Sequence, residues 1–123
     1  VCAKTKRAVV RALPLSEAGN LPGNGWLAIQ ATSVGLYPDC EKAAVEDRAF
    51  YEKVKAGYAL IYRPAETKFM KLVKETGAPA YNGLKMLLYQ GVEAFELWNG
   101  ITVSPERAQE VYGKLKRELE AGK

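Results

Sequence analysis

The most informative stretch of the chain is residues 82–98, which reads NGLKMLLYQGVEAFELW. Its apolar side chains recur at the i, i+3, i+4 and i+7 positions that share one face of a helix. The members of this apolar stripe are Leu84, Leu87, Leu88, Gly91, Phe95 and Trp98. We therefore predict a helix that begins after Asn82-Gly83 and packs its stripe against a sheet.

The sheet is predicted from shorter apolar runs that precede this helix. Residues 26–29 read WLAI and residues 58–62 read YALIY, and both have the almost wholly apolar composition of strands buried in a parallel sheet. We expect the first strand to end near Ala31 and the second to be stopped by Arg63-Pro64. Residues 79–81 are predicted to form a weaker third strand.

Helices are predicted before, between and after these strands. They cover residues 6–13, 46–55, 67–77 and 104–121. Thr67 and Ser104 are good N-cap residues for the last two of these helices. Strands that alternate with helices in this way form right-handed parallel βαβ units, so the predicted fold class is α/β with a parallel sheet. Ligands of such sheets bind beyond the carboxyl ends of the strands.

The composition of the 123 residues indicates one globular domain and excludes several kinds of site. Apolar residues make up 48% and charged residues 26% of the chain, which is close to the globular average. The chain has no histidine, so a Ser-His-Asp triad, a histidine metal site and an imidazole pH switch are excluded within it. Cys2 and Cys40 form no CxxC pair, and we interpret them as small apolar fillers in a reduced, cytoplasmic protein.

We expect neither a membrane nor a nucleic acid as a partner, and no metal site. No apolar run approaches the roughly 20 residues that a membrane helix needs. The formal charge is +4, but lysine and arginine are interleaved with glutamate, as in residues 66–74 and 107–117. A nucleic-acid surface usually gathers such cations into one stripe.

Three segments that follow predicted strands are candidate sites, and each has an ordinary alternative. Residues 3–7 read AKTKR, with three cations and no carboxylate. This pattern favours NADP over NAD in a dinucleotide fold, and it also suits a solvated tail. Residues 31–35 read ATSVG, whose hydroxyls beside a glycine suit either close approach to a flat ligand or an ordinary loop.

The third candidate combines Tyr62 with the predicted helix that follows Gly83. Projection at about 100° per residue places Gln90 off the centre of the apolar stripe. Its amide needs a partner, which is either a substrate hydroxyl or a neighbouring backbone group. Gly83 leaves room for a ligand at the start of the helix and offers unpaired N–H groups.

Three segments closely resemble the shikimate dehydrogenase family in order and spacing: residues 31–36 (ATSVGL), 60–69 (LIYRPAETKF) and 82–98. The resemblance implies reversible NADPH-dependent reduction of 3-dehydroshikimate to shikimate, in the biosynthesis of aromatic amino acids. It also implies an incomplete doubly wound parallel sheet. This sheet would be the C-terminal portion of a Rossmann-type NADP-binding domain over residues 1–100. A terminal helix over residues 101–123 would then pack toward a substrate domain.

By this resemblance, residues of all three segments contact the cofactor. Thr32 and Ser33 would lie against NADP, and Leu60 would contact its nicotinamide end. Gly83 would approach the cofactor through its backbone.

The resemblance implies further contacts with the adenosine 2′-phosphate and with the substrate. Ala3-Lys4-Thr5 stands where the family commonly has Asn-Arg-Thr, so Lys4 and Thr5 are the predicted contacts with that phosphate. Tyr62 and Gln90 are predicted to hydrogen-bond shikimate. The family's catalytic lysine and aspartate belong to sequence upstream of Val1, so no catalytic residue is predicted here.

Two alternatives stay open, a quinate/shikimate dehydrogenase and a non-catalytic NADP-binding or structural module. The second arises because the family's catalytic segment is absent from these 123 residues, which we expect to be inactive alone. A half-sheet has an exposed edge and an uncovered face. We therefore expect a homodimer or pairing with the N-terminal portion.

Overall fold

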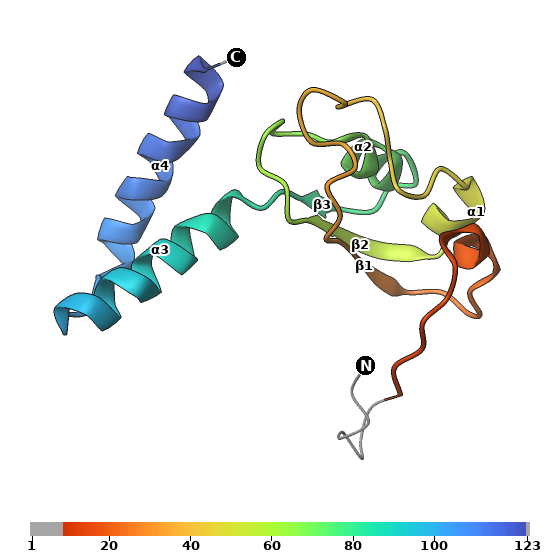
Figure 1. The fold of residues 1–123 in the computed structure, drawn as a ribbon, viewed down its shortest axis with the longest axis horizontal. Coiled ribbons are helices and arrows are strands. Elements are labelled where there is room, and N and C mark those ends of the chain that lie inside the picture. Colours follow the sequence, from red (N-terminus) through yellow and green to blue (C-terminus); the bar gives the residue numbers. More distant parts are fainter. Residues whose placement is uncertain (1–8, 123) are drawn as a thin grey trace.

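A three-stranded parallel sheet organises residues 9–122, the part of the chain that this computed structural model describes (Figure 1). The strands lie side by side in chain order, which confirms the predicted α/β class with a parallel sheet. The elements are the 3-10 helix η1 (Leu15–Asn20), β1 (Trp26–Gln30), α1 (Arg48–Tyr51), β2 (Val54–Ala59), α2 (Lys68–Glu75), β3 (Ala80–Tyr81), α3 (Leu84–Asn99) and α4 (Pro105–Ala121).

The second strand begins and ends earlier than its composition predicts, because β2 covers Val54–Ala59 and not residues 58–62. The predicted helix over residues 46–55 is only the four residues of α1, and β2 already starts at Val54. The carbonyl of Lys53 accepts hydrogen bonds from the backbone N–H groups of Gly25 and Trp26, both at 3.0 Å. These two bonds start the parallel ladder between β1 and β2, and pairing with a neighbouring strand overrides the local helical pattern.

The predicted helix over residues 6–13 is wrong for its described part. Residues 9–14 are irregular, and the helical segment that follows is η1 instead. Val9 is 82% exposed and Val10 is 59% exposed, so no neighbour among residues 9–122 covers the apolar face that this helix would present. A short helix without tertiary packing is not stable in water.

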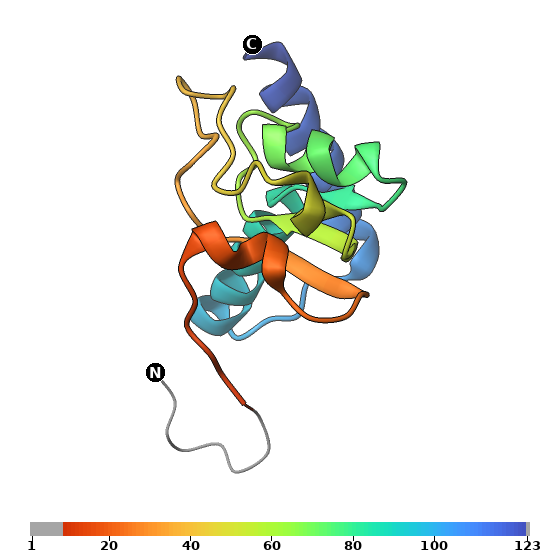
Figure 2. The ribbon, with the colours of Figure 1, turned by 90° about the vertical axis from the view of Figure 1, so that its right-hand side faces the viewer.

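One face of the sheet carries the core. Helices α1 and α2 lie on this face, as the two ribbon views show (Figure 1, Figure 2). A Cβ at Gly57 of β2 would lie 2.8 Å from Cγ2 of Val73 and 3.2 Å from the ring of Phe69. Glycine at this position therefore allows α2 to approach the sheet closely. On the opposite face, Leu27 and Ile29 are exposed.

Helix α3 does not pack on the sheet as the apolar stripe predicts. It packs against α4, and the two helices form a hairpin that projects from the sheet (Figure 1). Gly100 ends α3 in the left-handed conformation, and the hydroxyl of Ser104 accepts a hydrogen bond from the Arg107 N–H, which confirms the predicted cap of α4. The stripe is thus covered in part by a helix rather than by strands.

The described helices include none that is both long and apolar enough to cross a membrane.

Tyr51 provides a pH-dependent contribution to the stability of the core. Its side chain is almost fully buried and its hydroxyl donates a hydrogen bond to the carbonyl of Val45. Burial, aided by the negative charge of Glu46, raises the pKa of Tyr51 to about 12. The unfolded chain releases this proton near pH 10, so the contribution is present below that pH and is lost as pH rises toward 12.

We expect Tyr51→Phe to flatten the loss of stability between pH 10 and pH 12. In urea unfolding at a series of pH values, the unaltered chain should lose up to about 1.4 kcal/mol per pH unit more than the variant in this range. Tyr89→Phe, a change at an exposed tyrosine of α3, serves as the control and should keep the original slope. Identical slopes for all three chains would contradict the assignment.

Candidate functional site

The carboxyl ends of the three parallel strands meet at one edge of the sheet, where ligands of such folds bind. The segment that follows β1 carries Thr32 and Ser33, both of which are exposed. The segment that follows β2 carries Leu60 and Tyr62, and β3 is followed by Gly83. Five of the predicted site residues therefore lie in segments that leave this edge.

Gln30 joins the ends of β1 and β2. Its backbone carbonyl accepts a hydrogen bond from the Leu60 N–H at 3.0 Å. Gln30 is only 6% exposed, and its side chain makes two hydrogen bonds with the segment that follows β1. Nε2 donates to the Val34 carbonyl at 2.6 Å, and Oε1 accepts from the Thr32 N–H at 3.1 Å. The buried side-chain amide of Gln30 thus fixes the position of the Thr32 backbone.

Gly83 joins the ends of β2 and β3. Its N–H donates to the Ile61 carbonyl at 2.9 Å, and the next N–H, of Leu84, donates to Asn82 Oδ1 at 3.1 Å. The prediction that Gly83 offers unpaired N–H groups at the start of the helix is therefore wrong for these two groups. A Cβ at this position would lie 2.5 Å from the carbonyl oxygen of Leu60 and 2.7 Å from its carbonyl carbon. The close approach of two backbone segments therefore requires glycine here, which is a structural reason in addition to the cofactor contact that the sequence predicts.

Two cavities open beside the segment that follows β2. Their volumes are about 520 and 480 Å³, and both are lined by Tyr37, Tyr62, Arg63 and Leu119. The Arg63 guanidinium lies over the Tyr37 ring, 5.8 Å from its centre, and donates to the Gly122 carbonyl at 3.3 Å. The C-terminal end of α4 therefore reaches the part of the site that contains Tyr62.

Gln90 lies on an exposed part of α3, about two helical turns beyond Gly83. It lines neither of the cavities that contain Tyr62. Lys4 and Thr5 lie outside the described residues. The substrate contacts of Tyr62 and Gln90 and the phosphate contacts of Lys4 and Thr5 stay predictions.

Two carboxylates that follow these segments along the chain, Glu46 and Glu66, are paired with lysines. Lys74 donates to Glu66 at 2.5 Å, and this hydrogen bond lowers the pKa of Glu66 below its usual value. Lys68 donates to Glu46 at 2.8 Å and lowers the pKa of that carboxyl in the same way. Both pairs therefore stay formed at neutral pH, and neither leaves a bare carboxylate to oppose an anionic ligand.

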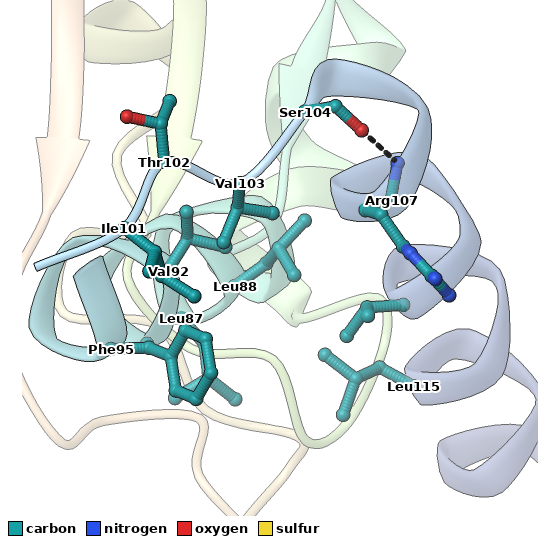
Figure 3. Close-up of a pocket in the computed structure, with 12 residues that line it drawn as sticks. Leu87, Leu88, Val92, Phe95, Ile101, Thr102, Val103, Ser104, Arg107 and Leu115 are labelled. Carbon is teal, nitrogen blue, oxygen red and sulfur yellow. Dashed lines mark hydrogen bonds between the residues drawn. The ribbon is translucent and has the colours of Figure 1, made fainter. Parts of the chain in front are cut away.

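A third cavity lies between α3 and α4 and was not expected from the sequence. Its volume is about 810 Å³, and Figure 3 shows Leu88 of α3 and Leu115 of α4 on either side of it. Most of its lining is apolar, and it includes Leu87, Leu88, Gly91 and Phe95 of the predicted stripe. The stripe thus lines an open groove as well as the contact with α4.

Sequence reasoning missed Gln30, although a signal for it exists. Alternate residues of a strand face the same side of a sheet. Gln30 is two residues after the buried Ala28, so its side chain points into the covered face. A polar side chain at such a position needs hydrogen-bond partners, and the following loop supplies them.

No group of three or more histidine, cysteine, aspartate or glutamate side chains suitable for a metal ion occurs within residues 9–122.

Comparison with known proteins connects the chain with one enzyme family. The family model described as "Shikimate 5'-dehydrogenase C-terminal domain" matches residues 83–111. The shikimate dehydrogenase (NADP(+)) of Clostridium perfringens strain 13 is 41% identical over 88 residues, which are 72% of this chain and 32% of that protein. The enzyme of the same name from Bacillus cereus strain B4264 is 35% identical over 111 residues, which are 90% of this chain and 40% of that protein.

Solved structures give the same result. A chorismate mutase/shikimate 5-dehydrogenase fusion protein from Clostridium acetobutylicum has a TM-score of 0.78 at 33% identity, over 86% of this chain and 38% of that one. Shikimate 5-dehydrogenase from Thermus thermophilus, solved in complex with NADP(H) and shikimate, has a TM-score of 0.67 at 34% identity, over 85% and 38%. The chain therefore spans less than half the length of the relatives that it matches.

Proposed function

The chain belongs to the shikimate dehydrogenase family, and from this premise we propose that the carboxyl edge of its sheet is the NADP-binding side of a shikimate dehydrogenase. The proposed reaction is the reversible NADPH-dependent reduction of 3-dehydroshikimate to shikimate in aromatic amino-acid biosynthesis. The observation that carries the proposal is that hydrogen bonds join the three strand ends: the Leu60 N–H donates to the Gln30 carbonyl, and the Gly83 N–H donates to the Ile61 carbonyl. The names of the relatives and the ligands of the Thermus thermophilus structure support it.

The residues at this edge suit a dinucleotide. Thr32 and Ser33 present exposed hydroxyls that can donate to phosphate or ribose oxygens, and half-buried Leu60 offers an apolar surface to a flat ring. Residues 31–36 and 60–64 contain no carboxylate that would repel the phosphates. Gly83 brings a backbone segment close to Leu60. When bound, NADPH would supply the hydride, and these residues would hold and orient it.

The substrate would lie beside the nicotinamide end of the cofactor. Tyr62 offers a phenolic hydroxyl and Gln90 an amide, and both groups can exchange hydrogen bonds with a polyhydroxylated ring. Both side chains are exposed, so they are accessible to such a ligand.

The remaining proposals concern the parts that complete the enzyme. Residues 1–100 would be the C-terminal portion of the NADP-binding domain, and residues 101–123 the helix that packs toward the substrate domain. A second copy or the N-terminal portion of the protein would cover the apolar surfaces, among them Leu27, Ile29 and Trp98, which is 83% exposed. The cytoplasm is the proposed location, which agrees with a Cys40 thiol that forms no disulfide within residues 9–122.

Calorimetric titration of the 123-residue chain with NADPH and NADH tests the proposed function. We expect weak binding of NADPH and about tenfold weaker binding of NADH, because NADH lacks the phosphate that Lys4 and Thr5 would contact through charge-assisted hydrogen bonds. Thr32→Val should weaken NADPH binding about fivefold, since it removes one hydroxyl.

The matched control is Thr102→Val, which makes the same change at an exposed threonine of the α3–α4 connection and should leave the affinity unchanged. Equal affinities for the two nucleotides would contradict the assignment of NADP. Binding of neither nucleotide would favour a structural module over a cofactor-binding one.

A further inference from the structure

We infer that Gln30 is a positioning residue for the cofactor loop, defined here as residues 31–35, and that its side-chain amide presents the Thr32 and Ser33 hydroxyls to NADP. The inference rests on the proposed function, because the cofactor loop is assigned there.

The side chain of Gln30 forms hydrogen bonds with two residues of the cofactor loop. Nε2 donates to the Val34 carbonyl at 2.6 Å, and Oε1 accepts from the Thr32 N–H at 3.1 Å. Only this orientation of the amide gives each of the two loop groups a complementary partner. One side chain therefore holds the loop on both sides of Ser33.

These two bonds restrain the loop more strongly than its own internal contact. The Thr32 hydroxyl accepts from the Val34 N–H at 3.3 Å, and that contact is exposed to water. The Gln30 side chain is 6% exposed, and hydrogen bonds in such surroundings are electrostatically stronger than bonds in water. Both polar atoms of the amide bond the loop backbone and the residue is buried, so its role is to hold the backbone and not to touch a ligand.

Gln30 also fixes the loop relative to the second strand end. Its backbone carbonyl accepts from the Leu60 N–H at 3.0 Å, and this bond does not depend on the side chain. A change of the side chain therefore separates two effects: the cofactor loop loses its anchor, while the junction of β1 and β2 keeps its hydrogen bond.

Two variants test the inference. Gln30→Met keeps the length and most of the shape of the side chain but removes both hydrogen bonds. Gln30→Glu keeps an acceptor for the Thr32 N–H and loses the donor to the Val34 carbonyl. Gln109→Met, at an exposed position of α4, is the matched control. For each chain, amide hydrogen exchange is followed by NMR and the NADPH affinity by calorimetry.

For Gln30→Met we expect exchange at the Thr32 amide to rise about tenfold or more, with unchanged protection at the Leu60 amide. The affinity for NADPH should fall about tenfold. Gln30→Glu should keep most of the protection at Thr32 while its affinity still falls, because the Val34 side of the loop is released. Gln109→Met should match the unaltered chain in both measurements.

Several results would overturn the inference. Unchanged exchange at Thr32 in Gln30→Met would show that the side chain does not order the loop. Faster exchange at Thr32 with unchanged NADPH affinity would show that loop order does not serve the cofactor. Loss of protection at the Leu60 amide as well in Gln30→Met would show that Gln30 contributes to stability in general and does not specifically position the loop. A failure of the unaltered chain to bind NADPH would instead refute the proposed function, and the role of Gln30 toward the cofactor with it.

Discussion

Gly83→Ala is expected to disrupt the carboxyl edge of the sheet and to abolish measurable NADPH binding. The new Cβ would lie 2.5 Å from the Leu60 carbonyl oxygen, 2.7 Å from its carbonyl carbon and 3.2 Å from its Cα. These are backbone atoms of a strand end, so they cannot move aside as a flexible side chain can. Gly83 has a φ of −82°, which alanine adopts readily, and the effect is therefore steric.

We expect this substitution to cost about 3 kcal/mol of unfolding free energy, a value typical of severe overpacking. In a thermal unfolding experiment this corresponds to a midpoint lower by about 10 °C for a domain of this size. Gly91→Ala is the control, because nothing lies within 4 Å of a Cβ at that position of α3. Alanine there should leave the midpoint unchanged or raise it, since it favours the helix. A Gly83→Ala chain that melts and binds NADPH normally would refute this account of the edge.

The second large effect concerns turnover. We expect the 123-residue chain, assayed alone, to show no shikimate-dependent formation of NADPH. Hydride transfer at the carbon of an alcohol needs a group that accepts the hydroxyl proton near neutral pH. The loops at the strand ends, residues 31–36, 60–64 and 82–83, contain no lysine, histidine or carboxylate. None of the lysines or aspartates within these 123 residues stands in a motif that resembles the family's catalytic pair.

The assay uses high concentrations of the chain, NADP and shikimate, and follows absorbance of the reduced nucleotide. The same chain with Gly83→Ala controls for contaminating enzymes, because a contaminant would be equally active in both preparations. Turnover by the unaltered chain that is lost in this variant would contradict the expectation, and would show that the 123 residues include an acid–base group.

Local signals in the sequence were sufficient for several elements of the fold. The caps at Thr67 and Ser104 depend on a side chain and a backbone N–H three residues later, so they were read correctly from short patterns. The apolar composition of residues 26–29 predicts a strand that ends near Ala31, and the observed strand is Trp26–Gln30. The helix that follows Gly83 was also predicted correctly as an element.

Elements that depend on distant neighbours were predicted less well. The start of β2 at Val54 is set by pairing with β1, and a helical pattern in residues 46–55 does not reveal that pairing. The apolar stripe of α3 correctly indicates a buried face, but its period is the same whether the partner is a sheet or α4. The apolar spacing in residues 6–13 leads to a helix only if another part of the protein covers the apolar face of that helix.

In the candidate site, too, some features follow from the sequence pattern and others depend on distant neighbours. Parallel topology brings the segments containing Thr32, Leu60 and Gly83 to one edge, and that topology follows from the order of predicted strands and helices. The contact between Gly83 and the Leu60 backbone depends on a distance between two chain segments, which no pattern contains. The role of Gln30 depends on which face its side chain enters, and a shift of strand register by one residue would reverse it.

We propose that the ends of the three strands form one binding surface for NADP. Titration of the ¹⁵N-labelled chain with NADPH, followed by NMR, tests it at the level of single residues. We predict that the amides of Thr32, Leu60 and Gly83 shift together and give one dissociation constant, while those of Thr102 and Leu115 at the α3–α4 groove stay unchanged. Shifts confined to the α3–α4 groove, or no shift at any of the three strand ends under saturating NADPH, would contradict the claim.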